Sequence, residues 1–103
     1  GVNDYSAGYS AQSLKYFKLY QNYPNPVAGH STIKYTILQP GNVKLSIYDY
    51  TGREIKTLVN EYKNEGDYEV QFNFNNVTSG LYFCKLTMGD LSQSVKILIK
   101  NKA

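Results

Sequence analysis

The sequence is poor in the residues that carry enzymatic and redox chemistry. Its 103 residues include one cysteine, Cys84, one histidine, His30, and no tryptophan. A single cysteine permits no internal disulfide. With one histidine, the chain has no second histidine to bind a metal and no complete set of nucleophile, base and orienting group for catalysis. No Gly-x-Ser-x-Gly elbow and no glycine-rich phosphate loop occurs in the sequence. We therefore expect no catalytic residue, no metal and no cofactor.

Long apolar runs are missing as well. None approaches the roughly 20 residues that cross a bilayer as a helix, so we expect no direct insertion into a membrane. Residues 1–4 carry no basic stretch followed by an apolar one, which is the pattern of a signal peptide. We expect the chain to be the end of a longer exported protein, with its export signal upstream.

The positive charge is dispersed. The net charge is +3, and of eleven basic residues only Arg53 is an arginine. Nucleic-acid-binding domains cluster their charge on one face with interleaved arginines, whereas these lysines are spread over the predicted strands. Lysines on solvated strand faces protect sheet edges from aggregation. We therefore expect no nucleic-acid partner.

The sequence does contain short segments in which apolar and polar residues alternate. Ile33, Tyr35 and Ile37 alternate with Thr32, Lys34 and Thr36, which predicts a strand with one buried face. The same period recurs over residues 43–47, 68–74, 82–86 and 95–99. Turn signals separate these segments at regular intervals, at Pro40-Gly41, Thr51-Gly52, residues 64–67, Ser79-Gly80 and Gly89-Asp90.

This spacing is typical of an all-β fold. We predict an immunoglobulin-like antiparallel β-sandwich of about seven strands over residues 19–103. Residues 54–63 are less regular and also fit a helical stripe, but the flanking hairpins favour a strand. Residues 1–18, rich in Ser, Gly, Ala, Asn and Tyr, are predicted to be a linker or a loosely attached leading segment. Cys84 is predicted to be an inert, buried thiol in mid-strand.

The segment from Asp49 to Glu54 superficially resembles a calcium loop. It carries only two carboxylates and lacks the alternating acidic positions of an EF-hand, so metal binding is not expected. A hairpin loop with Gly52 in a left-handed conformation explains the segment better.

Eleven tyrosines are many for a chain of this length. An exposed aromatic row on a β-sandwich can stack sugar rings, which makes a carbohydrate-binding or spacer module of a secreted enzyme the alternative function. The spacing of Tyr5, Tyr9, Tyr16, Tyr20 and Tyr23 does not keep to one face of a strand, so anchoring of the first strand is the simpler interpretation.

Several motifs resemble those of one family when they are taken in order. The first is Leu19-Tyr20-Gln21-Asn22-Tyr23-Pro24-Asn25-Pro26, in which the prolines favour an extended corner. It is followed by residues 31–35, by residues 43–55 with Asp49, Gly52 and Arg53, by Ser79-Gly80-Leu81-Tyr82-Phe83, and by Lys96-Ile97-Leu98-Ile99-Lys100. From Leu19 to Lys100 the chain is similar to the C-terminal sorting domains (type A) of type IX secretion, which are tags on proteins exported by Bacteroidetes-like bacteria.

The resemblance implies a specific role without chemistry. A cargo attached upstream would fold in the periplasm and be drawn by this domain through an outer-membrane translocon. A shuttle protein would take the tag to a surface sortase, which would cut before roughly Leu19 and attach the cargo to the cell surface; in some systems the cargo is released. The same fold is similar to a domain of flagellar hook-capping proteins, so a periplasmic or flagellar scaffold is a third hypothesis.

Three groups of residues are the candidates for this role. The opening motif comprises Tyr20, Asn22, Pro24, Asn25 and Pro26, and the hairpin motif comprises Asp49, Gly52 and Arg53. The sorting motif comprises Gly80, Tyr82, Lys96, Ile97, Ile99 and Lys100. Lys96 and Lys100 would project from one face of a terminal strand that a partner reads through acidic pockets and through the strand's backbone edge. The chain departs from the family at residues 27–30 and by continuing past Lys100 to Asn101 and Lys102.

Overall fold

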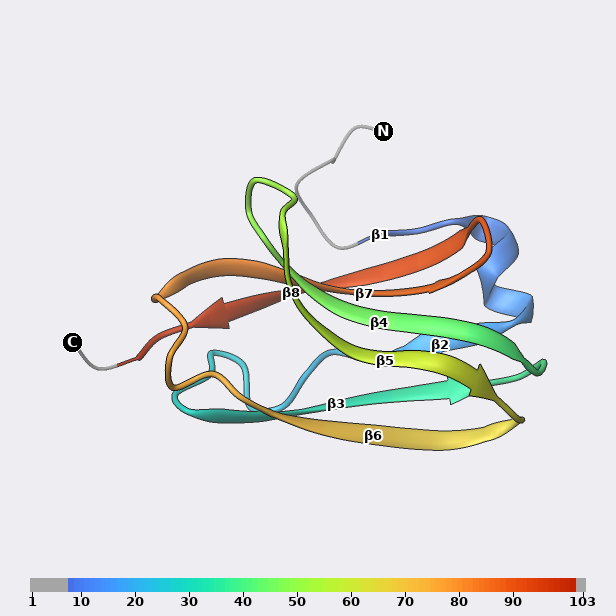
Figure 1. The fold of residues 1–103 in the computed structure, drawn as a ribbon, viewed down its shortest axis with the longest axis horizontal. Helices are drawn as coiled ribbons and strands as arrows, with labels where there is room; N and C mark the ends of the chain where they lie inside the picture. Colours follow the sequence, from blue (N-terminus) through green and yellow to red (C-terminus); the bar gives the residue numbers. More distant parts are fainter. Residues whose placement is uncertain (1–7, 102–103) are drawn as a thin grey trace.

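A computed structural model describes residues 8–101 and contains two antiparallel β-sheets packed as a sandwich (Figure 1). The predictions that concern residues 1–7, Tyr5 among them, and Lys102 lie outside the described residues. The elements are β1 Gly8–Tyr9, the 3-10 helix η1 Ala11–Lys15, β2 Phe17–Leu19, β3 His30–Ile37, β4 Gly41–Asp49, β5 Glu54–Lys63, β6 Gly66–Asn73, β7 Gly80–Met88 and β8 Leu91–Ile99. No helix within residues 8–101 is long and apolar enough to cross a membrane.

The two sheets differ in size. The larger has the strand order β1-β8-β7-β4-β5 and the smaller the order β2-β3-β6. The hairpins β4–β5 and β7–β8 stay within the larger sheet, whereas the connections β3–β4, β5–β6 and β6–β7 cross between the sheets (Figure 1). The prediction of an immunoglobulin-like sandwich of about seven strands is confirmed, because β2 to β8 are seven strands and β1 adds only two residues.

The core lies between the sheets and follows from the period-2 alternation. Each long strand turns every second side chain inward, and the fully buried apolar residues are Phe17, Val27, Ile33, Tyr35, Ile37, Val43, Leu45, Ile47, Phe74, Cys84, Leu86 and Ile97, with Ile99 3% exposed. Burying one such aliphatic or aromatic side chain contributes about 1.5–3 kcal/mol. The alternating segments of the sequence therefore supply nearly the whole core.

Strand β5 explains why residues 54–63 lack a clean period. Its pairing with β4 shifts register between Leu45 and Ser46 and again between Ile47 and Tyr48. Each shift leaves one extra residue on β5, Leu58 at the first and Ile55 at the second, and an extra residue interrupts the alternation. The strand prediction for this segment is correct.

Residues 8–18 are hydrogen-bonded to the sandwich. β1 pairs with β8 at Ser94 and Gln93, and β2 pairs with β3. Gln93, 6% exposed, holds this segment from β8: its Nε2 donates to Ser13 Oγ (2.9 Å) and to the Phe17 carbonyl (2.7 Å), and its Oε1 accepts from the Leu19 N–H (2.8 Å). The sequence predicts a loose segment over residues 1–18, because its partners on β8 are more than 70 residues away along the chain. The boundary of the domain at residue 19 stays a prediction.

We predict that Cys84 does not react while the protein is folded. Its side chain is fully buried on β7, and this burial raises the pKa of the thiol to about 12. At pH 8 a disulfide reagent such as 5,5′-dithiobis(2-nitrobenzoate) should modify it only after unfolding in guanidinium, because the thiolate is the reacting form. Rapid modification of the folded protein at a rate independent of its stability would contradict the burial.

Candidate functional site

The terminal strand β8 separates the sorting motif into exposed and buried members. Lys96 and Lys100 are exposed, whereas Ile97 (0% exposed) and Ile99 (3%) belong to the core. The alternation along the strand places both lysines on the solvent side of the larger sheet, with the half-exposed Leu98 between them. The two lysines are therefore the members of the sorting motif on this strand that a partner could touch.

The outer backbone edge of β8 is not free, which corrects the expectation that a partner reads it. Residues of the opening region cover it on the side away from β7. Gln21 Nε2 donates to the Lys96 carbonyl (2.6 Å), and Asn25 Oδ1 accepts from the Leu98 N–H (2.9 Å). The Val27 N–H donates to the Leu98 carbonyl and the Lys100 N–H donates to the Val27 carbonyl, both at 2.7 Å. The start and the end of the family-like region thus bind each other.

Asn22 fixes the corner that brings these residues to β8. It is 2% exposed, and its Nδ2 donates to the Pro24 carbonyl (3.1 Å) and to Ser31 Oγ (2.9 Å). Before the corner the chain follows β3 through the Tyr23–Thr32 bridge; after it the chain follows β8 through the Val27–Ile99 bridge. The peptide bonds that precede Pro24 and Pro26 are cis. The corner therefore passes the chain from the smaller sheet to the larger one.

Tyr20 of the opening motif lies on the smaller sheet. Its N–H donates to the Lys34 carbonyl (3.0 Å), and its hydroxyl is 3.0 Å from Thr36 Oγ1. It is 43% exposed. Of the other tyrosines weighed for sugar stacking, Tyr16 packs against the core and Tyr23 is 78% exposed, so the three do not form one exposed row.

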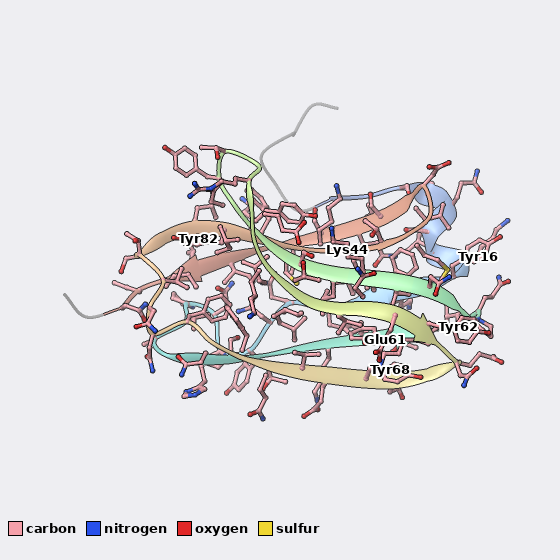
Figure 2. All side chains as sticks on the ribbon, in the orientation of Figure 1. Tyr16, Lys44, Glu61, Tyr62, Tyr68 and Tyr82 are labelled. Carbon is pink, nitrogen blue, oxygen red and sulfur yellow. The ribbon has the colours of Figure 1, made fainter. Side chains whose placement is uncertain are left out.

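Gly80 and Tyr82 of the sorting motif hold the corner between β6 and β7. The Tyr82 hydroxyl donates to the Thr78 carbonyl four residues back (2.7 Å), and Gly80 between them has φ +150°, where a side chain is strained. The start of β6 has the same arrangement: the Tyr68 hydroxyl donates to the Asn64 carbonyl (2.8 Å), and Gly66 lies between the two residues. Tyr82 and Tyr68 lie toward opposite ends of the sandwich (Figure 2). Corners of this kind are a hallmark of immunoglobulin-like sandwiches.

The hairpin motif builds the turn between β4 and β5. Asp49 Oδ1 accepts from the N–H groups of Thr51 (2.9 Å) and Arg53 (3.0 Å), its Oδ2 accepts from Arg53 Nε (3.2 Å), and Gly52 has φ +91°. The hydrogen bond from the Thr51 hydroxyl is the main cause that lowers the pKa of Asp49, with the backbone N–H of Arg53 next among the lowering causes. The turn itself therefore uses both oxygens of this carboxylate. Among residues 8–101 no group of three metal-binding side chains occurs.

Glu54 forms a polar cluster on the solvent side of the larger sheet. Its carboxylate accepts from Thr57 Oγ1, from Lys44 Nζ (2.9 Å) and from Ser46 Oγ (3.2 Å). The hydrogen bond from Thr57, followed by that from Lys44, lowers the pKa of Glu54 to about 2. The carboxylate therefore stays charged, and its hydrogen-bonding capacity is used within the chain.

Sequence reasoning missed Asn101, which it treated as a departure from the family. Its Nδ2 donates to the carbonyls of Phe74 and Val77, both at 2.7 Å, and its Oδ1 accepts from the Gly29 N–H (3.2 Å). Its backbone N–H donates to Ser79 Oγ (2.9 Å). The residue ties the end of β8 to two loops, and no local pattern could have revealed partners that are 22 to 72 residues distant.

Comparisons with known proteins give the family and the fold of the chain. A family model described as secretion system C-terminal sorting domain matches residues 21–100. No curated protein matches the chain. A crystal structure of dimeric latent PorU from Porphyromonas gingivalis is similar, with a TM-score of 0.61 and 20% identity over 84% of this chain. At this identity the likeness shows the fold alone, and the match spans 9% of the length of the PorU chain.

We predict that Asn101→Ala lowers the free energy of unfolding by about 2 kcal/mol. The Val77 carbonyl and the Gly29 N–H lose their partner, and the Phe74 carbonyl keeps only its bond from the Val77 N–H. Chemical denaturation followed by circular dichroism measures the change. Lys100→Ala is the matched control. Lys100 is adjacent to Asn101 and its side chain is exposed, so the stability of this variant should stay within about 0.5 kcal/mol of wild type. Equal stabilities for the two variants would show that the contacts of Asn101 contribute nothing.

Proposed function

The chain belongs to the family of type IX secretion system C-terminal sorting domains, and from this premise we propose that it is a non-catalytic signal whose exposed lysines are read by the export machinery. Membership implies a secretion signal on a cargo protein that crosses the outer membrane. The finer proposal concerns how the signal is presented, which partners handle it, and what becomes of the cargo.

The observation that carries the proposal is the presentation of Lys96 and Lys100. Lys96 lies on β8 and Lys100 directly follows it, and Ile97 and Ile99 between them are buried in the core. The outer edge of the strand is covered by residues 21–27. The anchored backbone fixes where the two lysine side chains leave the sheet, so acidic pockets can bind both ammonium groups without ordering the backbone. Backbone pairing with β8 is not part of the proposal, because Gln21, Asn25 and Val27 occupy that edge.

The proposed partners are those of the secretion route. They are an outer-membrane translocon, a shuttle protein and a surface sortase, in addition to the covalently attached upstream cargo. The sortase would remove the domain and attach the cargo to the cell surface, or the cargo would be released. Residues 8–18 are hydrogen-bonded to the sandwich, which disfavours proteolysis there. We therefore place the cut N-terminal to Gly8.

The proposal predicts that secretion depends on the two lysines. The chain would be fused to a fluorescent cargo with a signal peptide and expressed in a bacterium with a working type IX system. The double variant Lys96→Ala, Lys100→Ala should lower the secreted fraction about tenfold, because each lost charge pair weakens recognition. Point variants are required, since a chain ending at Met88 would lose the core residues Ile97 and Ile99 and unfold.

A matched control removes two other exposed lysines. The double variant Lys18→Ala, Lys34→Ala loses the same charge from the smaller sheet and should be secreted like wild type. Thermal unfolding of each purified chain establishes that all variants are folded. Equal secretion of both double variants would contradict recognition through the terminal lysines, and retention of the wild-type fusion in the periplasm would contradict the sorting function itself.

A further inference from the structure

The solvent side of the larger sheet carries an apolar patch outside the core. Its members, here called the outer patch, are Tyr48, Leu81, Phe83 and Leu98. Alternation turns them outward, because Ile47, Cys84 and Ile97 beside them are buried. Cross-strand pairing brings them together: Tyr48 is opposite Phe83, and Leu81 is opposite Leu98. Leu98 is 47% exposed and the other three are half-buried.

Two lysines flank the outer patch. Lys96 pairs across the strands with Phe83, and Lys85 Nζ lies 5.8 Å from the centre of the Tyr48 ring. Among residues 8–101 neither lysine has a carboxylate partner within 4 Å; the three ion pairs there involve Lys44, Arg53 and Lys63. Glu54, which lies on the same side of the sheet, is taken by Lys44, Ser46 and Thr57. Within the described residues Glu54 is balanced by Lys44, and Lys85 and Lys96 leave the charge around the patch positive.

The opposite side of the sandwich differs. On the smaller sheet the outward pairs are Thr32 with Gln71, Lys34 with Glu69, and Thr36 with Asp67. These pairs are polar, and the charges of Lys34 and Glu69 balance directly across the strands. Exposed aromatic groups occur on this side too, but Tyr20 and Tyr23 lie beside these polar pairs, in which the charges are balanced.

We infer that the outer patch with Lys85 and Lys96 docks a protein surface that presents carboxylates around an apolar centre. The inference rests on the proposed function and extends recognition from the terminal strand to β7 and β4. Half-buried aromatic groups at the centre and charges at the rim are the anatomy of a protein interface, and the positive rim selects an acidic partner.

Two other occupants fit the surface less well. Electrostatic binding to an anionic membrane uses clusters of roughly four to eight basic residues, and this rim holds two free lysines among the described residues. A second copy of the chain, joined by a two-fold axis through this surface, would bring two positively charged surfaces together, and like charges oppose such contact.

The test uses residues that lie outside the two-lysine signal. In the secretion assay with the full fusion, Phe83→Ser combined with Lys85→Glu should lower the secreted fraction about tenfold. Lys34→Glu, the same charge change on the smaller sheet, should be secreted like wild type. Binding of the purified chain to immobilised, detergent-solubilised outer-membrane translocon complex should weaken about tenfold in the first variant only. Thermal unfolding of each variant verifies its fold.

Each other outcome overturns the inference. Normal secretion of the Phe83, Lys85 variant beside a blocked Lys96, Lys100 variant would remove it and leave the proposed function standing. A retained wild-type fusion would remove both. Sedimentation of the wild-type chain with phosphatidylglycerol vesicles, abolished by Lys85→Glu, would assign the surface to a membrane. A dimer in analytical ultracentrifugation that Phe83→Ser dissociates would assign it to a second copy.

Discussion

The coverage of the outer edge of β8 is the constraint on which the rest of the structure depends. Unpaired N–H and C=O groups at a sheet edge invite pairing with other chains, and natural β-proteins protect such edges. Here β1 covers the first part of β8, and Gln21, Asn25 and Val27 cover the last part. β8 is therefore hydrogen-bonded along both edges, like an interior strand of a sheet. Its exposed side chains, and not its backbone, are available to a partner.

Amide side chains make most of these connections. Gln21, Asn25 and Gln93 bond to backbone groups that a neighbouring strand would otherwise satisfy, and Asn22 and Asn101 do the same at the two corners near the chain's ends. An amide offers both a donor and an acceptor, as the peptide group does, so it can replace a missing strand at a single position. Because amides are neutral, these connections do not titrate and leave the surface charge to the lysines.

The sequence could predict what depends on local pattern. Alternation over residues 33–37 and 43–47 identified strands and their buried faces, and Gly52 identified the hairpin turn. The two bulges of β5 interrupt its alternation, so the sequence of residues 54–63 also fitted a helix. The sequence indicated a turn at Gly80, but not that the Tyr82 hydroxyl bonds back to the Thr78 carbonyl across it.

The connections across the chain were beyond such reasoning. Gln21 and Lys96 are 75 residues apart, and Gly29 and Asn101 are 72 apart. No periodicity encodes a pair at that separation, so the sequence alone indicates a free edge on β8 and a loose segment over residues 1–18. The motifs at the two ends of the chain were each identified, but their contact with each other depends on the topology of the whole sandwich.

Hydrogen exchange of the Leu98 amide tests the central claim most directly. If Asn25 covers the edge of β8, this N–H should exchange at least about 100-fold more slowly than an unprotected amide in the wild-type protein. Asn25→Ala should abolish most of that protection while the Ile97 amide, on the same strand, stays protected. A Leu98 amide that exchanges freely in the wild-type protein would contradict the account, because the terminal strand would then be an open edge.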